Sequence, residues 1–207
     1  MNSGLVLNLD FQDSDTTYIY DRSRYKNNAT LTGTKKTEKG YYFNGSSDKA
    51  VVTASAPIQI AVSRITLMVW MKSSNTAEMA ILDKCDDGDA PTLGYGLRTD
   101  ASGNAIFTTN TDEYSSSKVI TDGVPHFVYG VLDGTNKFVG VDERAITTKA
   151  YTTAITDSAK NLSIGCQVNP EIYFTGRIYF GRVYNRGLTL GQIMAVYNAT
   201  KHLYRGD

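Results

Sequence analysis

Residues 171–204 read EIYFTGRIYFGRVYNRGLTLGQIMAVYNATKHLY, and the spacing of their apolar side chains changes halfway along. In the first half, between 172 and 183, apolar residues alternate with Gly, Arg and Tyr. The step from Ile178 to Phe180 has the period of two that places both side chains on one face of a strand. This half therefore predicts a long closing strand with one buried face.

The second half has the spacing of a helix. Thr189 occupies an N-cap position and Gln192 follows three residues later, which is the pattern of a capping box. We predict one short helix over residues 190–201, and we expect it to pack over an edge or an end of a sheet. The apolar residues that would make this contact are Ile193, Met194, Val196 and Tyr197.

The rest of the chain is a series of short strand-like segments separated by turn residues. The clearest is ITLMVWMK at 65–72, in which both alternating sets are apolar at the centre, so we expect a central strand. Asn44-Gly45 and Asp133-Gly134 are typical of hairpin turns. More than a dozen such segments at even spacing indicate a sandwich or a barrel.

Composition limits the classes of partner. The chain has 207 residues, of which 41% are hydrophobic, and this suits one domain with a core over residues 1–207. Its formal net charge is zero, so no overall field draws it to nucleic acid or to an anionic membrane. No stretch has the apolar length needed for insertion into a bilayer.

The two cysteines, Cys85 and Cys166, allow a disulfide, two buried thiols or one of each. The amino-terminal sequence MNSGLVLNLDF lacks the basic and apolar regions of a secretory signal. We therefore favour thiols, as expected after synthesis in a reducing cytoplasm.

No motif for catalysis stands out. The five glutamates are scattered, and the closest acidic pair, Asp142-Glu143, is interpreted as an exposed turn. No nucleophile turn, P-loop or dinucleotide fingerprint occurs, and His126 at a strand start is interpreted as a structural hydrogen-bonding residue. We therefore predict that the protein is not an enzyme.

An ordered set of blocks resembles the laminin-G-like domain of the concanavalin A-like lectin/glucanase superfamily. The blocks are Gly4–Phe11, Asp21–Leu31, Tyr42–Gly45, Ile65–Lys72, His126–Gly134, Leu162–Gly165 and Phe174–Tyr197. The resemblance implies an all-β, two-sheet antiparallel jelly-roll sandwich with one short C-terminal helix. It also implies that the closing strand pairs near Leu5–Phe11, which would bring the termini together. Pro125, Glu143 and Arg24 depart from the family pattern in loops.

The sequence YNATKHLYRGD at 197–207 resembles the same region of such domains in bacteriophage virion proteins. This implies a non-enzymatic virion structural protein, made in the host cytoplasm, that serves as a decoration, fibre or adhesion module. Its expected partners are other virion proteins, in a homo-oligomer or a capsid or tail assembly, and cell-surface glycans. The alternatives are a free carbohydrate-binding module and, more distantly, a glycoside hydrolase.

A glycan site would need aromatic rings for stacking and polar groups for the hydroxyls. The candidate residues are Tyr95, Arg98, Tyr114 and Tyr173. The alternative is that these side chains simply cover the sheets.

No cofactor is required by this interpretation, but two places could hold a structural Ca²⁺. One is the acidic loop that carries Asp83, Asp86, Asp87 and Asp89, since Ca²⁺ takes six to eight oxygen ligands. The other, implied by the resemblance, lies between the loops of Asp21 and Asn44. The alternatives are a solvated loop tip and an aspartate that orders its own turn.

Overall fold

The computed structural model describes residues 3–12, 14–87, 91–143, 145–167 and 172–206. In chain order the elements are β1 (Leu5–Asp10), β2 (Tyr18–Ile19), β3 (Ala29–Thr32), β4 (Lys35–Lys36), β5 (Tyr41–Asn44), β6 (Lys49–Val52), the 3-10 helix η1 (Ala56–Ile58), β7 (Ile65–Lys72), β8 (Met79–Asp83), β9 (Tyr95–Thr99), β10 (Asn104–Thr109), β11 (Asp112–Val119), β12 (His126–Leu132), β13 (Asn136–Val141), β14 (Ala145–Ala150), β15 (Leu162–Ile164), β16 (Thr175–Tyr184) and α1 (Leu190–Tyr204).

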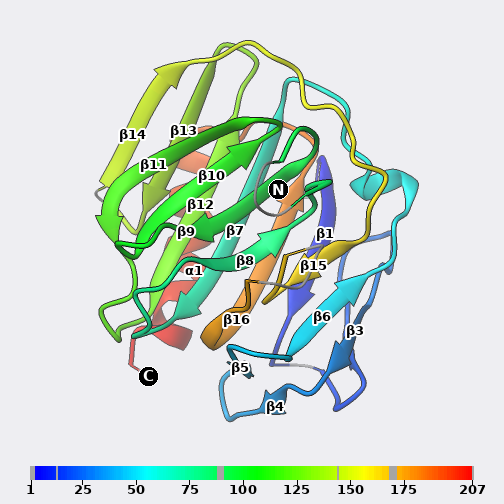
Figure 1. The fold of residues 1–207 in the computed structure, drawn as a ribbon, viewed down its shortest axis with the longest axis vertical. Coiled ribbons are helices and arrows are strands. Elements are labelled where there is room, and N and C mark those ends of the chain that lie inside the picture. Colours follow the sequence, from blue (N-terminus) through cyan, green and yellow to red (C-terminus); the bar gives the residue numbers. More distant parts are fainter. Residues whose placement is uncertain (1–2, 13, 88–90, 144, 168–171, 207) are drawn as a thin grey trace.

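The strands of the described residues form two eight-stranded antiparallel sheets packed face to face (Figure 1). Sheet A has the order β14-β13-β12-β7-β16-β5-β4, with β1 paired to β16, and sheet B has the order β11-β10-β9-β8-β15-β6-β3-β2. This confirms the predicted all-β sandwich with one C-terminal helix. The pairing of β1 with β16 confirms that the closing strand lies beside Leu5–Asp10, whereas the N and C labels of Figure 1 stand apart because α1 continues beyond β16.

β7 is a central strand, as its sequence predicts. It pairs with β12 on one side and with β16 on the other. Ile65, Leu67, Val69 and Met71 point into the core between the sheets, whereas Met68 and Trp70 point to the outer face of sheet A. Burial of both apolar sets therefore requires a second layer of protein on that outer face.

The closing strand contains an irregularity that alternation alone does not predict. The register of β16 against β7 shifts between Ile178 and Phe180. Ile178 therefore lies in the core between the sheets, whereas Tyr179 and Phe180 both belong to the outer apolar layer. The prediction that Ile178 and Phe180 share a face is wrong because a β-bulge adds one residue to the strand.

Helix α1 supplies the second layer. Its N-terminus has the predicted capping box between Thr189 and Gln192. The helix lies behind sheet A, on the side away from sheet B (Figure 1), and it buries Ile193, Val196, Tyr197 and Tyr204 against the outer apolar layer. The expectation that it packs at an edge or end is therefore wrong, because it covers the aromatic side chains of the central strands.

The centre of this layer is aromatic. Tyr197 stacks on Trp70 with ring centroids 5.7 Å apart and an interplanar angle of 13°. Trp70 Nε1 donates a hydrogen bond of 2.9 Å to Thr200 Oγ1, so the one polar atom of the indole is satisfied by the helix. These contacts fix the helix over sheet A.

Several smaller predictions can also be compared with the structure. Cys85 and Cys166 are both buried and carry free thiols. His126 bridges two carboxylates, with Nδ1 2.8 Å from Asp142 and Nε2 2.9 Å from Asp122, which confirms its structural role. Among the residues that the structure describes, no helix is long and apolar enough to cross a membrane.

Candidate functional site

Tyr95, predicted to stack on a sugar, lies inside the sandwich. Its ring is fully buried in the core, and its hydroxyl donates a 2.8 Å hydrogen bond to the carbonyl of Ile58 in η1. Burial raises the pKa of Tyr95 well above its ordinary value. The side chain cannot contact a ligand at the surface, so this prediction is wrong. Tyr95 instead stabilises η1 from the core side through its hydrogen bond to Ile58.

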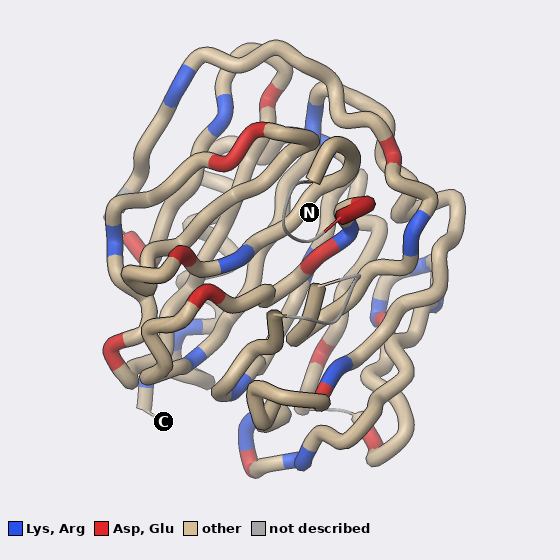
Figure 2. The backbone as a smooth tube through the Cα atoms, viewed as in Figure 1, with Lys and Arg blue, Asp and Glu red and all other residues tan. Residues whose placement is uncertain are grey.

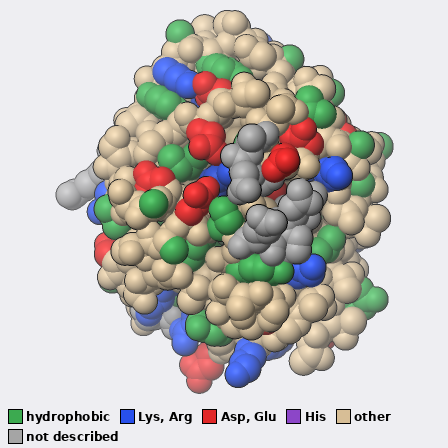
Figure 3. All heavy atoms as spheres, in the orientation of Figure 1, with side chains coloured by type: hydrophobic (Ala, Val, Ile, Leu, Met, Phe, Trp, Pro, Cys, Tyr) green, Lys and Arg blue, Asp and Glu red, His purple; other side chains and the backbone are tan. Residues whose placement is uncertain are grey.

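Arg98 lies on the outer face of sheet B, the face that Figure 3 presents. The side chain is 3% exposed and forms ion pairs of 3.2 Å with both Asp83, which is 1% exposed, and Glu113; Glu78 lies 4.0 Å away. Burial would lower the pKa of Arg98, but its carboxylate neighbours, led by Asp83, raise it. The guanidinium therefore links neighbouring strands of sheet B through its ion pairs. Because the side chain is buried, a ligand at the surface has little access to it.

The structure shows a grouping of carboxylates that the sequence spacing did not reveal. Glu78, Asp83 and Glu113 come from different parts of the chain and meet at Arg98 because β8, β9, β10 and β11 are neighbours in sheet B. Figure 3 shows Asp and Glu side chains gathered near the middle of this face.

The four predicted glycan residues do not form one site. Tyr95 and Arg98 share β9 but occupy opposite faces of it. Tyr114 is half-buried, with the ammonium of Lys149 4.9 Å above its ring. Tyr173 is half-buried and forms an isolated bridge with Cys166.

The described carboxylates of the acidic loop have different interaction partners. Asp83 pairs with Arg98, while Asp86 accepts hydrogen bonds from the backbone of Thr92 and Leu93 and from the Thr92 hydroxyl. Burial would raise the pKa of Asp86, but these hydrogen bonds lower it. Asp87 is exposed, and Asp89 lies outside the described residues. A Ca²⁺ site in this loop stays a prediction.

Asp21 and Asn44 both order their own turns. The buried carboxylate of Asp21 accepts hydrogen bonds from the backbone N–H groups of Asn8, Ser23 and Asn27 and from the Ser23 hydroxyl, at 2.7–2.9 Å. Asn44 Oδ1 accepts from the N–H groups of residues 46, 47 and 48. Within the described part of the chain, no three His, Cys, Asp or Glu side chains are grouped to hold a metal. The turn interpretation therefore accounts for both residues.

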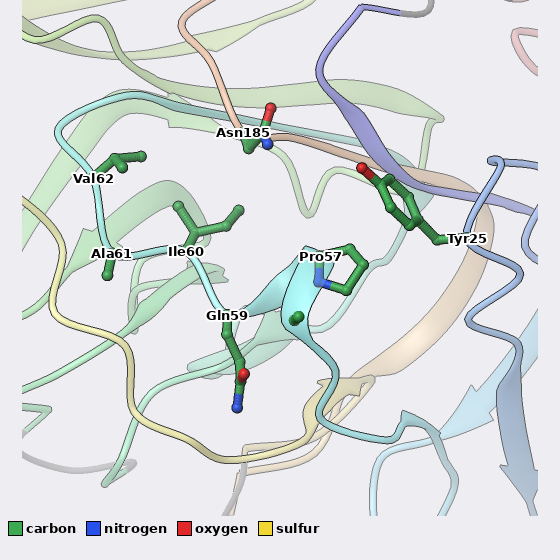
Figure 4. A pocket seen from close by; sticks show the side chains of 8 residues that line it. Tyr25, Pro57, Gln59, Ile60, Ala61, Val62 and Asn185 are labelled. Atoms are coloured by element: carbon green, nitrogen blue, oxygen red, sulfur yellow. The ribbon is translucent and has the colours of Figure 1, made fainter.

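A pocket of about 360 Å³ opens at one end of the sandwich (Figure 4). We call it the Tyr25 pocket; it is lined by Tyr25, Ala56, Pro57, Gln59, Ile60, Ala61, Val62 and Asn185. Tyr25 and Pro57 form one wall and residues 60–62 form the other, with the Asn185 amide above them. Gln59 extends away from both Tyr25 and Asn185.

Hydrogen bonds hold the loops of this pocket in place. The loop that carries Tyr25 is shaped by the Asp21 turn, and Ser55 Oγ lies 3.0 Å from Asn27 Oδ1, which joins that loop to η1. Tyr95 supports η1 through the carbonyl of Ile58. The N–H of Asn185 donates to the carbonyl of Gly4 at 2.9 Å, which joins the end of β16 to the start of β1.

The chemistry of the lining favours binding over catalysis. It consists of one aromatic ring, a proline, aliphatic side chains and two amides, without a carboxylate, imidazole, thiol or serine hydroxyl. General acid–base catalysis needs a group that exchanges protons near neutral pH, and these side chains contain none. The sequence did not indicate this pocket because its residues lie in loops and in the short helix η1, which have no periodic pattern.

Solved structures with a similar fold include botulinum neurotoxin structures and a sialidase. A botulinum neurotoxin type C structure, from a toxin that depends on two ganglioside molecules to enter cells, matches with a TM-score of 0.71 at 16% identity over 96% of this chain and 51% of that chain. The binding domain of botulinum neurotoxin DC in complex with SialylT matches with a TM-score of 0.68 at 14% identity, over 96% and 52%.

The Trypanosoma rangeli sialidase in complex with sialic acid matches with a TM-score of 0.72 at 17% identity, over 94% of this chain and 32% of that chain. The chain thus spans about half the length of the two toxin chains and about a third of the sialidase chain. At these identities the likeness concerns the fold alone. No curated protein sequence matches significantly.

The sequence pattern of one family covers most of the sandwich. It matches residues 43–194, from the end of β5 into α1, and so includes β7, β16 and the capping box. The chain belongs to this family, the laminin-G-type branch of the concanavalin A-like lectin/glucanases superfamily.

Proposed function

We propose that this lectin-like sandwich is a non-enzymatic glycan-binding domain and that the Tyr25 pocket is its binding site. The observation that carries the proposal is the lining of that pocket, which places an aromatic ring and a proline beside the amide of Asn185 at the end of a rigid sandwich. Sites of this kind combine an apolar surface with a few polar groups that fix orientation.

The physical basis is the mixed surface of a sugar. The C–H groups on one face of a pyranose pack against Tyr25 and Pro57, whose rings lie together on one wall. The sugar hydroxyl groups can accept hydrogen bonds from the NH2 group of Asn185 and donate to its amide oxygen. Such a shallow site predicts weak binding of a single glycan, strengthened when several copies bind together.

We further propose a setting in a bacteriophage virion, where the domain would serve as a decoration, fibre or adhesion subunit. The support is the resemblance of residues 197–207 to virion proteins. In that setting a homo-oligomer would present several Tyr25 pockets to host glycans. Mass spectrometry and immunogold microscopy of purified particles test this setting; a chain found only free of particles would favour the free carbohydrate-binding module.

Glycan binding is tested on the whole chain with a glycan array, followed by calorimetric titration of the best neutral oligosaccharide. Ala61→Arg should abolish binding because Ala61 is exposed and a long side chain there fills the pocket without removing a core contact. Tyr25→Ala should weaken binding by about fivefold, since stacking of an aromatic ring contributes about 1 kcal/mol.

Tyr18→Ala is the matched control, because Tyr18 is 41% exposed on β2 and does not line the pocket. Equal binding by the wild type and Ala61→Arg would contradict the location of the site. Release of reducing ends from the bound glycan would contradict the non-enzymatic part of the proposal and favour a glycoside hydrolase.

A further inference from the structure

Arg24, one of the loop residues that depart from the family pattern, lies next to the wall of the Tyr25 pocket. Its guanidinium stands over the ring of Tyr25, with Cζ 4.7 Å from the ring centroid. Arg24 Nη2 also donates a hydrogen bond of 2.5 Å to Tyr25 Oη. Arg24 itself does not line the pocket, so its guanidinium contacts the ring from outside the pocket. The two contacts therefore hold one wall of the pocket at its ring and at its hydroxyl.

The backbone beneath this pair is fixed by the Asp21 turn. The N–H of Tyr25 donates to Ser23 Oγ at 3.2 Å, and the Ser23 hydroxyl donates to the buried carboxylate of Asp21 at 2.7 Å. These bonds place the backbone of Tyr25 and leave its side-chain torsions to other contacts. The ring is half-buried and packs partly against the core, and among the described residues only Arg24 bonds its hydroxyl end.

The hydrogen bond from Arg24 also determines what the Tyr25 hydroxyl can do. A guanidinium only donates, so Tyr25 Oη accepts from Arg24 and keeps its own proton for another acceptor. Within the described part of the chain, no group accepts this proton. The hydroxyl end of Tyr25 is directed towards Asn185 (Figure 4). A sugar oxygen between these two side chains would extend the chain of hydrogen bonds, and polarisation by the cation strengthens the hydroxyl as a donor.

A ring that is held in advance also lowers the cost of binding. A side chain that becomes immobile on binding loses conformational entropy, and a ring that Arg24 already fixes loses less. A cation over an exposed ring and a charge-assisted hydrogen bond act here on the same side chain. Lys and Arg positions are interspersed with Asp and Glu positions over the backbone (Figure 2), so we treat the effect of Arg24 as local.

We propose that Arg24 is a positioning residue of the Tyr25 pocket, which fixes the ring of Tyr25 as a wall and directs its hydroxyl to donate to the ligand. This inference rests on the proposed function of the pocket. It adds that the bound glycan presents an acceptor oxygen, from a hydroxyl, a ring or an acetamido carbonyl, to Tyr25 Oη.

The first test needs no glycan. Three-bond couplings measured by NMR on the isotopically labelled whole chain report the χ1 torsion of Tyr25. The wild type should show a single rotamer. Arg24→Met keeps a long side chain and removes the guanidinium, so it should show averaging between rotamers. Averaging in the wild type, or one unchanged rotamer in Arg24→Met, would overturn the proposal.

The second test is a calorimetric titration with the neutral oligosaccharide that binds best on the glycan array. Arg24→Met should weaken binding about threefold, and Tyr25→Phe, which removes only the hydroxyl, should also weaken it about threefold. Because both changes remove the same hydrogen bond, the double variant should lose about fivefold, less than the about ninefold loss of independent effects. Arg24→Lys keeps a cation and a donor and should recover most of the loss.

Arg22→Met is the matched control, because Arg22 lies in the same loop, with Cζ 5.6 Å from the ring centroid of Tyr20, and does not line the pocket. It should bind as the wild type does. A loss in the double variant equal to the product of the single losses would overturn the proposal. If the wild type binds, Ala61→Arg does not and Arg24→Met binds normally, only the role of Arg24 fails. Equal binding by the wild type and Ala61→Arg contradicts the proposed function itself.

Discussion

The outer faces of the two sheets are buried in different ways. On sheet A, aromatic side chains of β7, β12 and β16 are covered by α1, with Trp70 between Phe127 and Tyr197. On sheet B, the corresponding surface contains Arg98 among Asp83, Glu78 and Glu113. One face is stabilised by the hydrophobic effect, which has little directional requirement, and the other by ion pairs that depend on geometry.

This difference has a consequence for binding. Because α1 covers the middle of sheet A and the Arg98 ion pairs occupy the middle of sheet B, the pocket proposed to bind glycans lies at one end of the sandwich. This pocket is built from loops and η1 on a rigid scaffold, and binding residues usually lie on such connecting segments. Changes to either outer face should therefore alter stability before they alter binding.

The largest expected effect follows from removal of the helix. A chain that ends at Leu188 should aggregate or fail to fold, because Trp70, Phe127 and Tyr179 would become exposed and each such ring buries roughly 150–250 Å². Solubility and size-exclusion chromatography measure this result. Tyr197→Ala is the milder companion and should lower the free energy of unfolding by about 3–5 kcal/mol. A soluble truncated chain with a cooperative melt would show that sheet A does not need this cover.

An intermediate effect is expected on the other face. Arg98→Met should lower the free energy of unfolding by about 3–5 kcal/mol, because Asp83 would remain buried without its cation. The double variant Arg98→Met, Asp83→Leu should recover most of this loss, since an apolar pair carries no desolvation cost. Denaturant titration measures both variants, and equal losses in the two would mean that the ion pair is not the cause.

The smallest effect is a dependence on pH at the start of β12. Burial would lower the pKa of His126, but the hydrogen bonds that its ring N–H groups donate to Asp142 and Asp122 outweigh this effect, so the pKa is raised in the folded state. Protonated His126 then adds stability below its unfolded pKa of about 6.5, and this stability is lost as the pH rises through the folded pKa. His126→Gln should flatten this decline in thermal melts; an unchanged slope would exclude His126 as its source.

Local sequence predicted the elements that have a strong period. Alternation from Ile65 to Met71 identified a central strand, and the Thr189–Gln192 pair marked the start of α1. It could not place α1 over the outer face, because an apolar stripe does not specify which surface covers it. It also missed the bulge after Ile178, which depends on the register of β16 against β7.

Much less of the candidate sites could be predicted from the sequence. Tyr95 and Tyr25 are the same residue type, yet one supports η1 from the core and the other forms a pocket wall. The residue type predicts what a tyrosine side chain can bind. Its position in the fold, in the core or at the surface, decides whether a ligand can reach it.

The sequence by itself determined the sandwich class and the helix cap, because these depend on short-range periods and turn residues. Only the tertiary structure decided that Lys72, Arg177 and Tyr42 stand side by side, and that Glu78, Asp83 and Glu113 meet at Arg98. The physical reason is strand pairing: register between strands distant in the sequence sets which side chains meet, and no local pattern records it.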